Sequence, residues 1–382
     1  MTNRRKFLAL VGGGAVLAAG GAGSWAMTRD PAQARLPWEQ AGETEDDPRR
    51  KALSYAILAP NPHNRQPWLA DLSVPDEITL YCQQDRRLPH TDPYDRQITV
   101  GLGCFLELFS QAAAQDGWRA DIEFFPEGEP QPRLDGRPVA RVRFAAQSNA
   151  QPDPLFGHVL QRRSNKEAFD SSRAVDTGLL GEIASAARTS RIAFTNERAE
   201  VEALRAKAWA AMDVELRTYR TAKESVDLLR IGKAEIEANP DGIDLAGPLM
   251  EALSVTGLLD REAMLDVNST VFRQQAEALK PSFDTAMAFM WLATPGNSRA
   301  DQIRAGRDYV RLNLAATGLG VDMHPMSQAL QEYPEMQPHF DGMRAATGMA
   351  PGETLQMFVR LGYGPRLAAS PRWPYETRIR TA

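Results

Sequence analysis

The chain has 382 residues, with 44 Lys and Arg against 49 Asp and Glu, so its formal net charge is −5. This acidic balance excludes a protein that reads nucleic-acid phosphates through a basic surface, and a mean hydropathy of −0.39 excludes a polytopic membrane protein. Two cysteines, Cys82 and Cys104, are too few for a disulfide framework or a Cys-rich zinc site, and the length suits two lobes.

The N-terminus has the pattern of an export signal. Arg4 and Arg5 precede an uncharged stretch, 7–28, that is rich in Gly and Ala, and Ala32 and Ala34 give a small-x-small cleavage pattern. Paired arginines before a weakly apolar stretch resemble a twin-arginine signal. We therefore expect residues 1–34 to engage the twin-arginine export machinery and the protein to be periplasmic or exported. An uncleaved membrane anchor is the alternative.

The next elements follow from periodicity and punctuation. Residues 35–46 are polar and predict a loose linker. The chain then predicts helices at 49–58, 97–115, 177–187, 198–219 and 299–317, and strands at 78–82, 122–125, 139–144, 286–292 and 356–361. Three prolines make 59–68 a stiff loop. Residues 223–280 predict short helices, with breaks at Asn239-Pro240 and Lys280-Pro281.

Two apolar helices indicate an internal repeat. Residues 103–117 align with 306–320, an offset of 306 − 103 = 203, and both segments begin and end with Gly. The helix ending at Ala59 matches the one ending at Ala187, an offset of 187 − 59 = 128. The alternative is that two apolar helices resemble each other by composition alone.

The repeat predicts the domain organisation. The two offsets differ by 203 − 128 = 75 residues, so the second half carries an insertion. We expect two tandem homologous lobes, 35–150 and 151–382. The insertion, at about 220–282, is expected to be a helical lid.

Several common chemistries have no motif in this chain. The five histidines form no HExxH or HxH pair, so no metal site is predicted. There is no P-loop and no G-x-S-x-G nucleophile elbow. We therefore nominate no catalytic residue and no metal ligand.

One basic segment suits a phosphate. Arg162, Arg163, Ser164 and Lys166 precede Phe169. Guanidinium groups offer bidentate donors to phosphate oxygens, and a hydroxyl adds another. A solvated basic turn is the alternative.

A second segment suits a flat ring. Pro60, Asn61, Asn64, Gln66 and Trp68 place amide donors and an aromatic on the stiff loop. A heteroaromatic ring bordered by carbonyls and nitrogens needs such groups. A turn with a buried Trp is the alternative.

Together these segments resemble a known family. With the segment 319–326, the segment 361–365 and Arg372, they are similar to FMN-dependent nitroreductases. The layout resembles the dormancy-associated, nitroreductase-like branch, in which one chain mimics the usual homodimer. This resemblance implies an α+β fold in which each lobe is an antiparallel sheet wrapped by helices. The resemblance covers most of 48–372 outside the insertion and implies a monomer that acts as a pseudo-dimer.

The resemblance implies which residues bind FMN. The full set is Pro60, Asn61, Asn64, Gln66, Arg162, Arg163, Ser164, Lys166, Pro325, Met326, Ser327, Arg366 and Arg372. Arg162, Ser164 and Lys166 correspond to the groups that hold the phosphate and the N1/O2 edge, with Arg366 and Arg372 completing the phosphate clamp. Pro325 and Met326 would cover one flavin face, and the Ser327 N–H would face N5.

The resemblance also implies the activity: an exported oxidoreductase that passes hydride through flavin N5 to a nitro- or quinone-like acceptor from a reduced nicotinamide or another donor. Three positions depart from the family pattern, and the last of them, where Gln replaces Gly beside the reactive edge, argues against fast turnover but not against flavin binding. One extra residue separates Lys166 from Phe169, Asn61 replaces a usual Ser, and Ser327-Gln328 replaces an acidic residue and Gly. The alternatives are a flavin-sequestering protein closed by the lid and a catalytically dead scaffold.

One flavin per chain is expected. The loop 61–68 lies in the first half, and the clamp at 162–166 and Arg372 lies in the second. The mirror positions, 188–192 and 49–52, lack the Pro, Gln, Trp and Ser that a second site needs.

Overall fold

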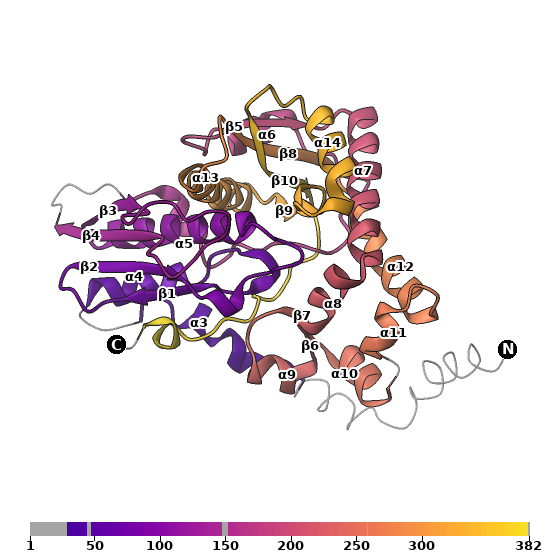
Figure 1. Cartoon of the computed structure of the whole chain (residues 1–382), viewed down its shortest axis with the longest axis horizontal. Helices are drawn as coiled ribbons and strands as arrows, with labels where there is room; N and C mark the ends of the chain where they lie inside the picture. The colour runs from indigo at the N-terminus through magenta and orange to yellow at the C-terminus, as the bar shows by residue number, and fades with distance from the viewer. Residues whose placement is uncertain (1–28, 44–46, 147–151, 258, 381–382) are drawn as a thin grey trace.

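The computed structural model describes residues 29–43, 47–146, 152–257 and 259–380 (Figure 1). Arg4, Arg5 and the rest of the expected signal up to residue 28 lie outside the described residues. No helix in the described ranges combines the length and apolar character needed to cross a membrane.

The fold contains two four-stranded sheets of the same topology. The first has the order β1 (Trp68–Asp71), β2 (Glu77–Cys82), β4 (Ala140–Ala146), β3 (Trp118–Phe124). The second has the order β5 (Arg191–Thr195), β8 (Ala288–Thr294), β10 (Thr354–Gly362), β9 (Asp322–Pro325). Every pair in both sheets is antiparallel. The α+β class and the tandem-lobe arrangement are thereby confirmed.

Helices cover both sheets. In chain order they are α3 (Leu36–Glu39), α4 (Pro48–Ala56), α5 (Arg96–Gln115), α6 (Thr177–Ala184), α7 (Arg198–Arg217), α8 (Tyr219–Asp227), α9 (Gly232–Ala238), α10 (Pro248–Val255), α11 (Arg261–Leu265), α12 (Thr270–Asp284), α13 (Arg299–Gly318) and α14 (Gln337–Ala346). Local chemistry sets their starts: the Asp47 side chain caps α4, and Ser298 with Asp301 forms a capping box on α13.

Two long helices form the centre of the molecule. Helices α5 and α13 lie side by side between the two sheets in Figure 1. A Cβ on Gly306 would overlap the Val100 carbonyl oxygen, and one on Gly103 would overlap the Ile303 carbonyl oxygen. Gly103 and Gly306 are the paired first residues of the sequence repeat, so the two helices touch at equivalent points. Only glycine permits this backbone-to-backbone approach.

The helical insertion connects two neighbouring strands of the second sheet. The chain passes from β5 to β8 through 196–287, whereas the equivalent β1-to-β2 connection is only 72–76. The insertion includes helices α7–α12 and the small parallel pair β6 (Leu229–Ile231) and β7 (Ile243–Leu245). Helix α7 is part of it, so the helical segment starts before the expected residue 220.

Two expectations about local structure were wrong. Residues 35–46 are not a loose linker throughout, because α3 buries Pro37 and Trp38 against the core. Lys280-Pro281 does not break a helix, since Pro281 lies inside the last turn of α12. The Thr285 N–H donates to the Pro281 carbonyl at 3.1 Å, and this bond keeps the turn closed.

The central contact generates a stability prediction. Gly306→Ala must push α5 and α13 apart, so we expect the free energy of unfolding to fall by about 2–4 kcal/mol. The matched control is Gly181→Ala in α6, where an added Cβ meets nothing within 4 Å. That variant should be neutral or stabilised by up to about 1 kcal/mol, because alanine favours helix. Urea unfolding followed by circular dichroism measures both, and equal effects would contradict the close crossing.

Candidate functional site

The basic segment 162–166 is held in place by the end of β10 and the residues that follow it, 362–365. The Asn165 side-chain amide donates to the Pro365 carbonyl at 2.9 Å. A Cβ on Gly362 would overlap the Phe169 ring, so the ring packs directly on the chain there. The Arg360 guanidinium lies 4.0 Å from the centre of the same ring. Phe169 and Asn165 therefore anchor the segment that carries Arg162 to Lys166.

Arginines from the second lobe meet the first lobe at the end of α4. Arg162 donates to the Leu58 carbonyl and to Asn313 Oδ1, both at 3.0 Å. Arg372 donates to the Leu58 carbonyl at 3.1 Å and to Asn64 Oδ1 at 2.6 Å. The structure thus brings the predicted clamp and the predicted loop together across the lobe boundary.

This arginine cluster (Arg162, Arg163 and Arg372) has no carboxylate as a hydrogen-bond partner among the described residues. Among the described residues, no carboxylate accepts a hydrogen bond from any of the three; carbonyl, amide and hydroxyl oxygens do. Burial, together with the nearby charges of Arg162 and Arg163, lowers the pKa of Arg372 to about 9 against the opposing charge of Asp244. Burial likewise lowers the pKa of Arg163 to about 10.

Uncompensated buried charge favours an anion. Removing a charge from water is costly unless an opposite charge replaces the solvent, and guanidinium groups pair well with phosphate. The Arg162 Nε–H is buried and has no hydrogen-bond partner in the described part of the chain. These residues therefore fit the phosphate of a cofactor such as FMN. Arg366 is exposed, and its charge helps to lower the pKa of Arg163. Ser164 lies beside the Tyr309 hydroxyl.

A second group of residues gathers around Lys166. The Arg360 Nε–H donates to His324 Nδ1 at 3.1 Å, so this histidine is neutral. Burial, with smaller contributions from the charges of Lys166 and Arg65, lowers the pKa of His63 to about 4. Burial, Arg360 and Lys166 hold the pKa of His324 well below its usual value. The charge of Lys166 thus acts on one histidine from each lobe, and both rings are neutral at pH 7.

The loop after α4 has a strained backbone. His63, Asn64 and Gln66 have backbone φ angles of 47°, 50° and 50°. Residues other than glycine rarely adopt positive φ. The fully buried Gln66 donates to the Pro240 carbonyl at 2.7 Å and accepts from the Trp373 N–H at 2.9 Å. The insertion and the C-terminal segment therefore both hold this loop in place.

The remaining predicted loop residues have defined positions. Pro60 is buried at the start of the loop. Asn61 Oδ1 accepts from the Gln66 N–H at 2.7 Å, which closes the loop on itself. The side-chain groups of Gln66 bond within the fold, so this residue shapes the loop.

The segment after β9 offers unpaired polar atoms. Pro325 ends β9 opposite Val359, and the buried Met326 donates its N–H to the Phe358 carbonyl at 2.8 Å. The short 3-10 helix η5 (Ser327–Leu330) follows. Ser327 Oγ and Gln328 Oε1 are buried there without a hydrogen-bond partner among the described residues.

A buried glutamate that the sequence did not single out joins this segment to the loop. Glu215, on α7, accepts from Gln331 Nε2 at 2.8 Å and from Ser225 Oγ at 3.4 Å. Ser225 Oγ lies 3.1 Å from His63 Nε2. Burial raises the pKa of Glu215 to about 7. No pattern in the sequence marks Glu215, because it is one of several acidic residues along α7.

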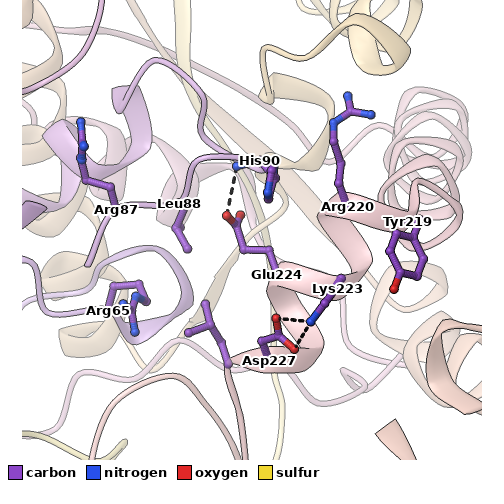
Figure 2. A pocket seen from close by; sticks show the side chains of 10 residues that line it. Arg65, Arg87, Leu88, His90, Tyr219, Arg220, Lys223, Glu224 and Asp227 are labelled. Atoms are coloured by element: carbon purple, nitrogen blue, oxygen red, sulfur yellow. Dashed lines mark hydrogen bonds and ion pairs between the residues drawn. The ribbon is translucent and has the colours of Figure 1, made fainter. Parts of the chain in front are cut away.

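A cavity of about 420 Å³ lies between the insertion and the segment around His90 (Figure 2). Its charges are mostly paired. Lys223 Nζ lies 2.7 Å from Asp227 Oδ2, and Glu224 accepts the His90 N–H at 3.0 Å. None of the predicted cofactor residues lines it, so it is separate from the arginine cluster.

The mirror of the arginine cluster is neutralised. Ala186, equivalent to Leu58 by the offset of 128, has its carbonyl oxygen 2.7 Å from Arg311 Nε. Glu107 pairs with Arg311 at 2.9 Å and with Arg307 at 2.8 Å, and Asp153 also pairs with Arg311. Carboxylates satisfy the arginines here, so this position does not favour an added anion.

No family model matches the chain. The chain is 27% identical over 332 residues to a Mycobacterium tuberculosis (strain H37Rv) protein named "Putative NAD(P)H nitroreductase Rv3131". The alignment covers 86% of this chain and 88% of the relative. The protein acg of the same organism, named in the same way, is 24% identical over 359 residues, 86% and 93% of the two chains. Alignments of this length include both lobes.

Two solved structures are similar at a lower level. The FMN-dependent nitroreductase NfnB from Mycobacterium smegmatis, in complex with NADPH, has 19% identity, a TM-score of 0.36 and coverage of 60% of this chain and 98% of its own. A nitroreductase with bound FMN from Bacteroides fragilis has 13% identity, a TM-score of 0.33 and coverage of 56% and 91%. We draw no conclusion from scores this low.

Glu215 generates a pH prediction. Its pKa is about 7 in the folded protein against about 4.5 when unfolded, so the folded state keeps a proton that the unfolded state releases as pH rises. The glutamate therefore costs up to about 3 kcal/mol of stability above pH 7 and nothing below about pH 4.5. Glu215→Gln should gain more stability at pH 8 than at pH 5.

Urea unfolding at the two pH values measures this difference. The control is Glu202→Gln, an exposed position on the same helix. It should change stability equally at both pH values. If the change in stability between pH 5 and pH 8 were the same for Glu215→Gln and Glu202→Gln, this result would contradict the raised pKa of the buried Glu215 carboxyl.

Proposed function

We propose that the chain is an FMN-dependent, nitroreductase-like oxidoreductase that holds one FMN between its two lobes. One observation carries the proposal: an arginine cluster, with Arg162 and Arg372 buried and Arg163 half-buried, that donates no hydrogen bond to a carboxylate of the described residues. The names of the relatives, which provisionally describe NAD(P)H nitroreductases, support the same class. The two lobes then play the part of two subunits.

In this proposal, residues of both lobes bind different parts of the cofactor. Arg162 and Arg163 hold the phosphate, with Arg366 nearby at the surface, and Arg372 positions the loop carbonyls. Lys166 faces the pyrimidine edge of the ring, where a cation stabilises negative charge. Ser327 and the loop 61–66 border the ring from opposite lobes. When bound, FMN supplies two-electron transfer chemistry.

The neutral state of His63 and His324 limits which side chains can transfer a proton near the flavin ring. His63 and His324 stay unprotonated at pH 7 because burial and Lys166 oppose their charge. Glu215, with a pKa of about 7, is the titratable group linked to His63 through Ser225. A nitro- or quinone-like acceptor and a reduced nicotinamide donor are the proposed substrates.

A second candidate function, flavin storage, has one observation in its favour. Four contacts fasten the insertion to the loop: Ser225 to His63 at 3.1 Å, Pro240 to Gln66 at 2.7 Å, the Gly242 N–H to the Asn64 carbonyl at 3.3 Å, and Arg65 to Asp241 at 3.5 Å. A lid held by several contacts opens rarely and slows exchange of the ligands beneath it.

Purification with the cofactor distinguishes these functions. We expect the full chain to carry noncovalent FMN at one per chain, because of the two equivalent positions in the described ranges one has arginines without a hydrogen-bonded carboxylate and the other has ion pairs. Absorbance gives the ratio, and heat release with chromatography identifies the flavin. NADH- or NADPH-dependent reduction of 1,4-benzoquinone supports the oxidoreductase. Bound FMN that dithionite reduces but neither nicotinamide turns over supports storage. FAD, two flavins per chain or a colourless protein would contradict the proposal.

We also propose that the protein is exported through the twin-arginine route. The support is Arg4 and Arg5 before the uncharged stretch 7–28. Replacing both arginines by lysine should retain the full chain in the cytoplasm, because that route reads the arginine pair. Fractionation of cells expressing each form measures this. Equal export of the double variant would indicate the general secretory route.

A further inference from the structure

The first described segment of the chain covers the arginine cluster. Residues 31–42, here called the N-terminal strap, form the 3-10 helix η1 (Ala32–Arg35) and helix α3. The Trp38 side chain on α3 is only 5% exposed. Its ring centre lies 5.8 Å from the guanidinium carbon of Arg162, 4.9 Å from that of Arg163 and 5.4 Å from that of Arg372. One indole thus contacts the whole cluster.

Hydrogen bonds fasten the strap at both ends. The Trp38 Nε1–H donates to the Ser370 carbonyl at 2.8 Å, and the Arg372 N–H donates to the Ala34 carbonyl at 2.8 Å. The Gly42 N–H donates to Ser54 Oγ at 3.0 Å. The strap therefore bridges the C-terminal segment and α4, the two elements whose residues meet at the cluster.

The indole holds the cations without neutralising them. A guanidinium stacked on an aromatic face gains about 0.5–2 kcal/mol, while its N–H donors point outward in its own plane. The unpartnered Arg162 Nε–H is such a donor. The indole carries no formal charge, so repulsion among the three cations remains. This arrangement orients donors in advance for an anion.

We propose that Trp38 is a positioning residue of the cofactor's phosphate subsite, and that the N-terminal strap and the bound phosphate stabilise each other. The inference rests on the proposed function, because it takes the phosphate to be that of FMN. Thermodynamic linkage makes the effect reciprocal: whatever the strap adds to FMN affinity, FMN adds to the docking of the strap. Riboflavin, which has the same ring and no phosphate, gains nothing from the strap.

The experiment compares FMN with riboflavin. Both are titrated by flavin fluorescence into flavin-free full-length protein and its variants. Trp38→Ala should weaken FMN binding by about tenfold or more, since it loosens three guanidinium groups at once, and should leave the affinity for riboflavin unchanged. Trp38→Phe keeps an aromatic face and should lose much less. Trp209→Ala, which removes an indole from the insertion, is the matched control and should change neither affinity.

A second readout follows the strap itself. Trypsin cleaves after Arg35 only when the strap lifts. FMN should slow this cleavage in the wild type and in Trp38→Phe, while riboflavin should not. If Trp38→Ala fails to fold, as circular dichroism would show, this protection and the Trp38→Phe titration still decide the proposal.

The outcomes are distinct. An unchanged FMN affinity in folded Trp38→Ala, or cleavage after Arg35 that FMN does not slow, overturns the inference while the proposed function stands. A tighter affinity also overturns it, because the indole would then occupy the place of the phosphate. A wild-type protein that binds riboflavin and FMN equally shows that no phosphate subsite exists. Failure to bind either flavin refutes the proposed function itself.

Discussion

The backbone contact between α5 and α13 at Gly103 and Gly306 determines where everything else lies. Because no side chain separates the helices at that point, the two lobes have one relative position that keeps the core packed. This position places Asn313 of α13 next to the end of α4, where Arg162 reaches both. The candidate site therefore exists only in the assembled pair of lobes, and neither lobe contains its full set of groups.

The two equivalent positions across this contact have opposite electrostatics. On one side, arginines donate to carbonyl oxygens and to no carboxylate of the described residues; on the other, Glu107 and Asp153 form ion pairs with Arg311. Duplicated lobes normally give duplicated sites. Here the carboxylates convert one position into a structural ion-pair network. The asymmetry of the site thus arises from a few charged side chains on a symmetric backbone.

Much of this could be predicted from the sequence, and the misses have physical reasons. The long helix at 97–115 was found within one residue because its apolar periodicity is strong. Strands β1, β5 and β9 were missed because each has only four or five residues, and β9 ends in Pro325. The sequence predicts a linker around Trp38, because a single buried aromatic residue produces no periodic pattern of apolar residues. Glu215 was missed because its desolvation comes from residues distant in sequence.

The docked strap has a consequence for the maturation of the chain. Ala34 is 4% exposed, and its carbonyl is bonded to the Arg372 N–H, so the peptide after the small-x-small pattern lies within the folded structure. A processing protease needs an accessible, extended peptide. In the folded chain this peptide is inside a 3-10 turn and is neither. Cleavage after Ala34, the position that the small-x-small pattern would mark, therefore requires the strap to be undocked, so a strap that folds first protects this peptide.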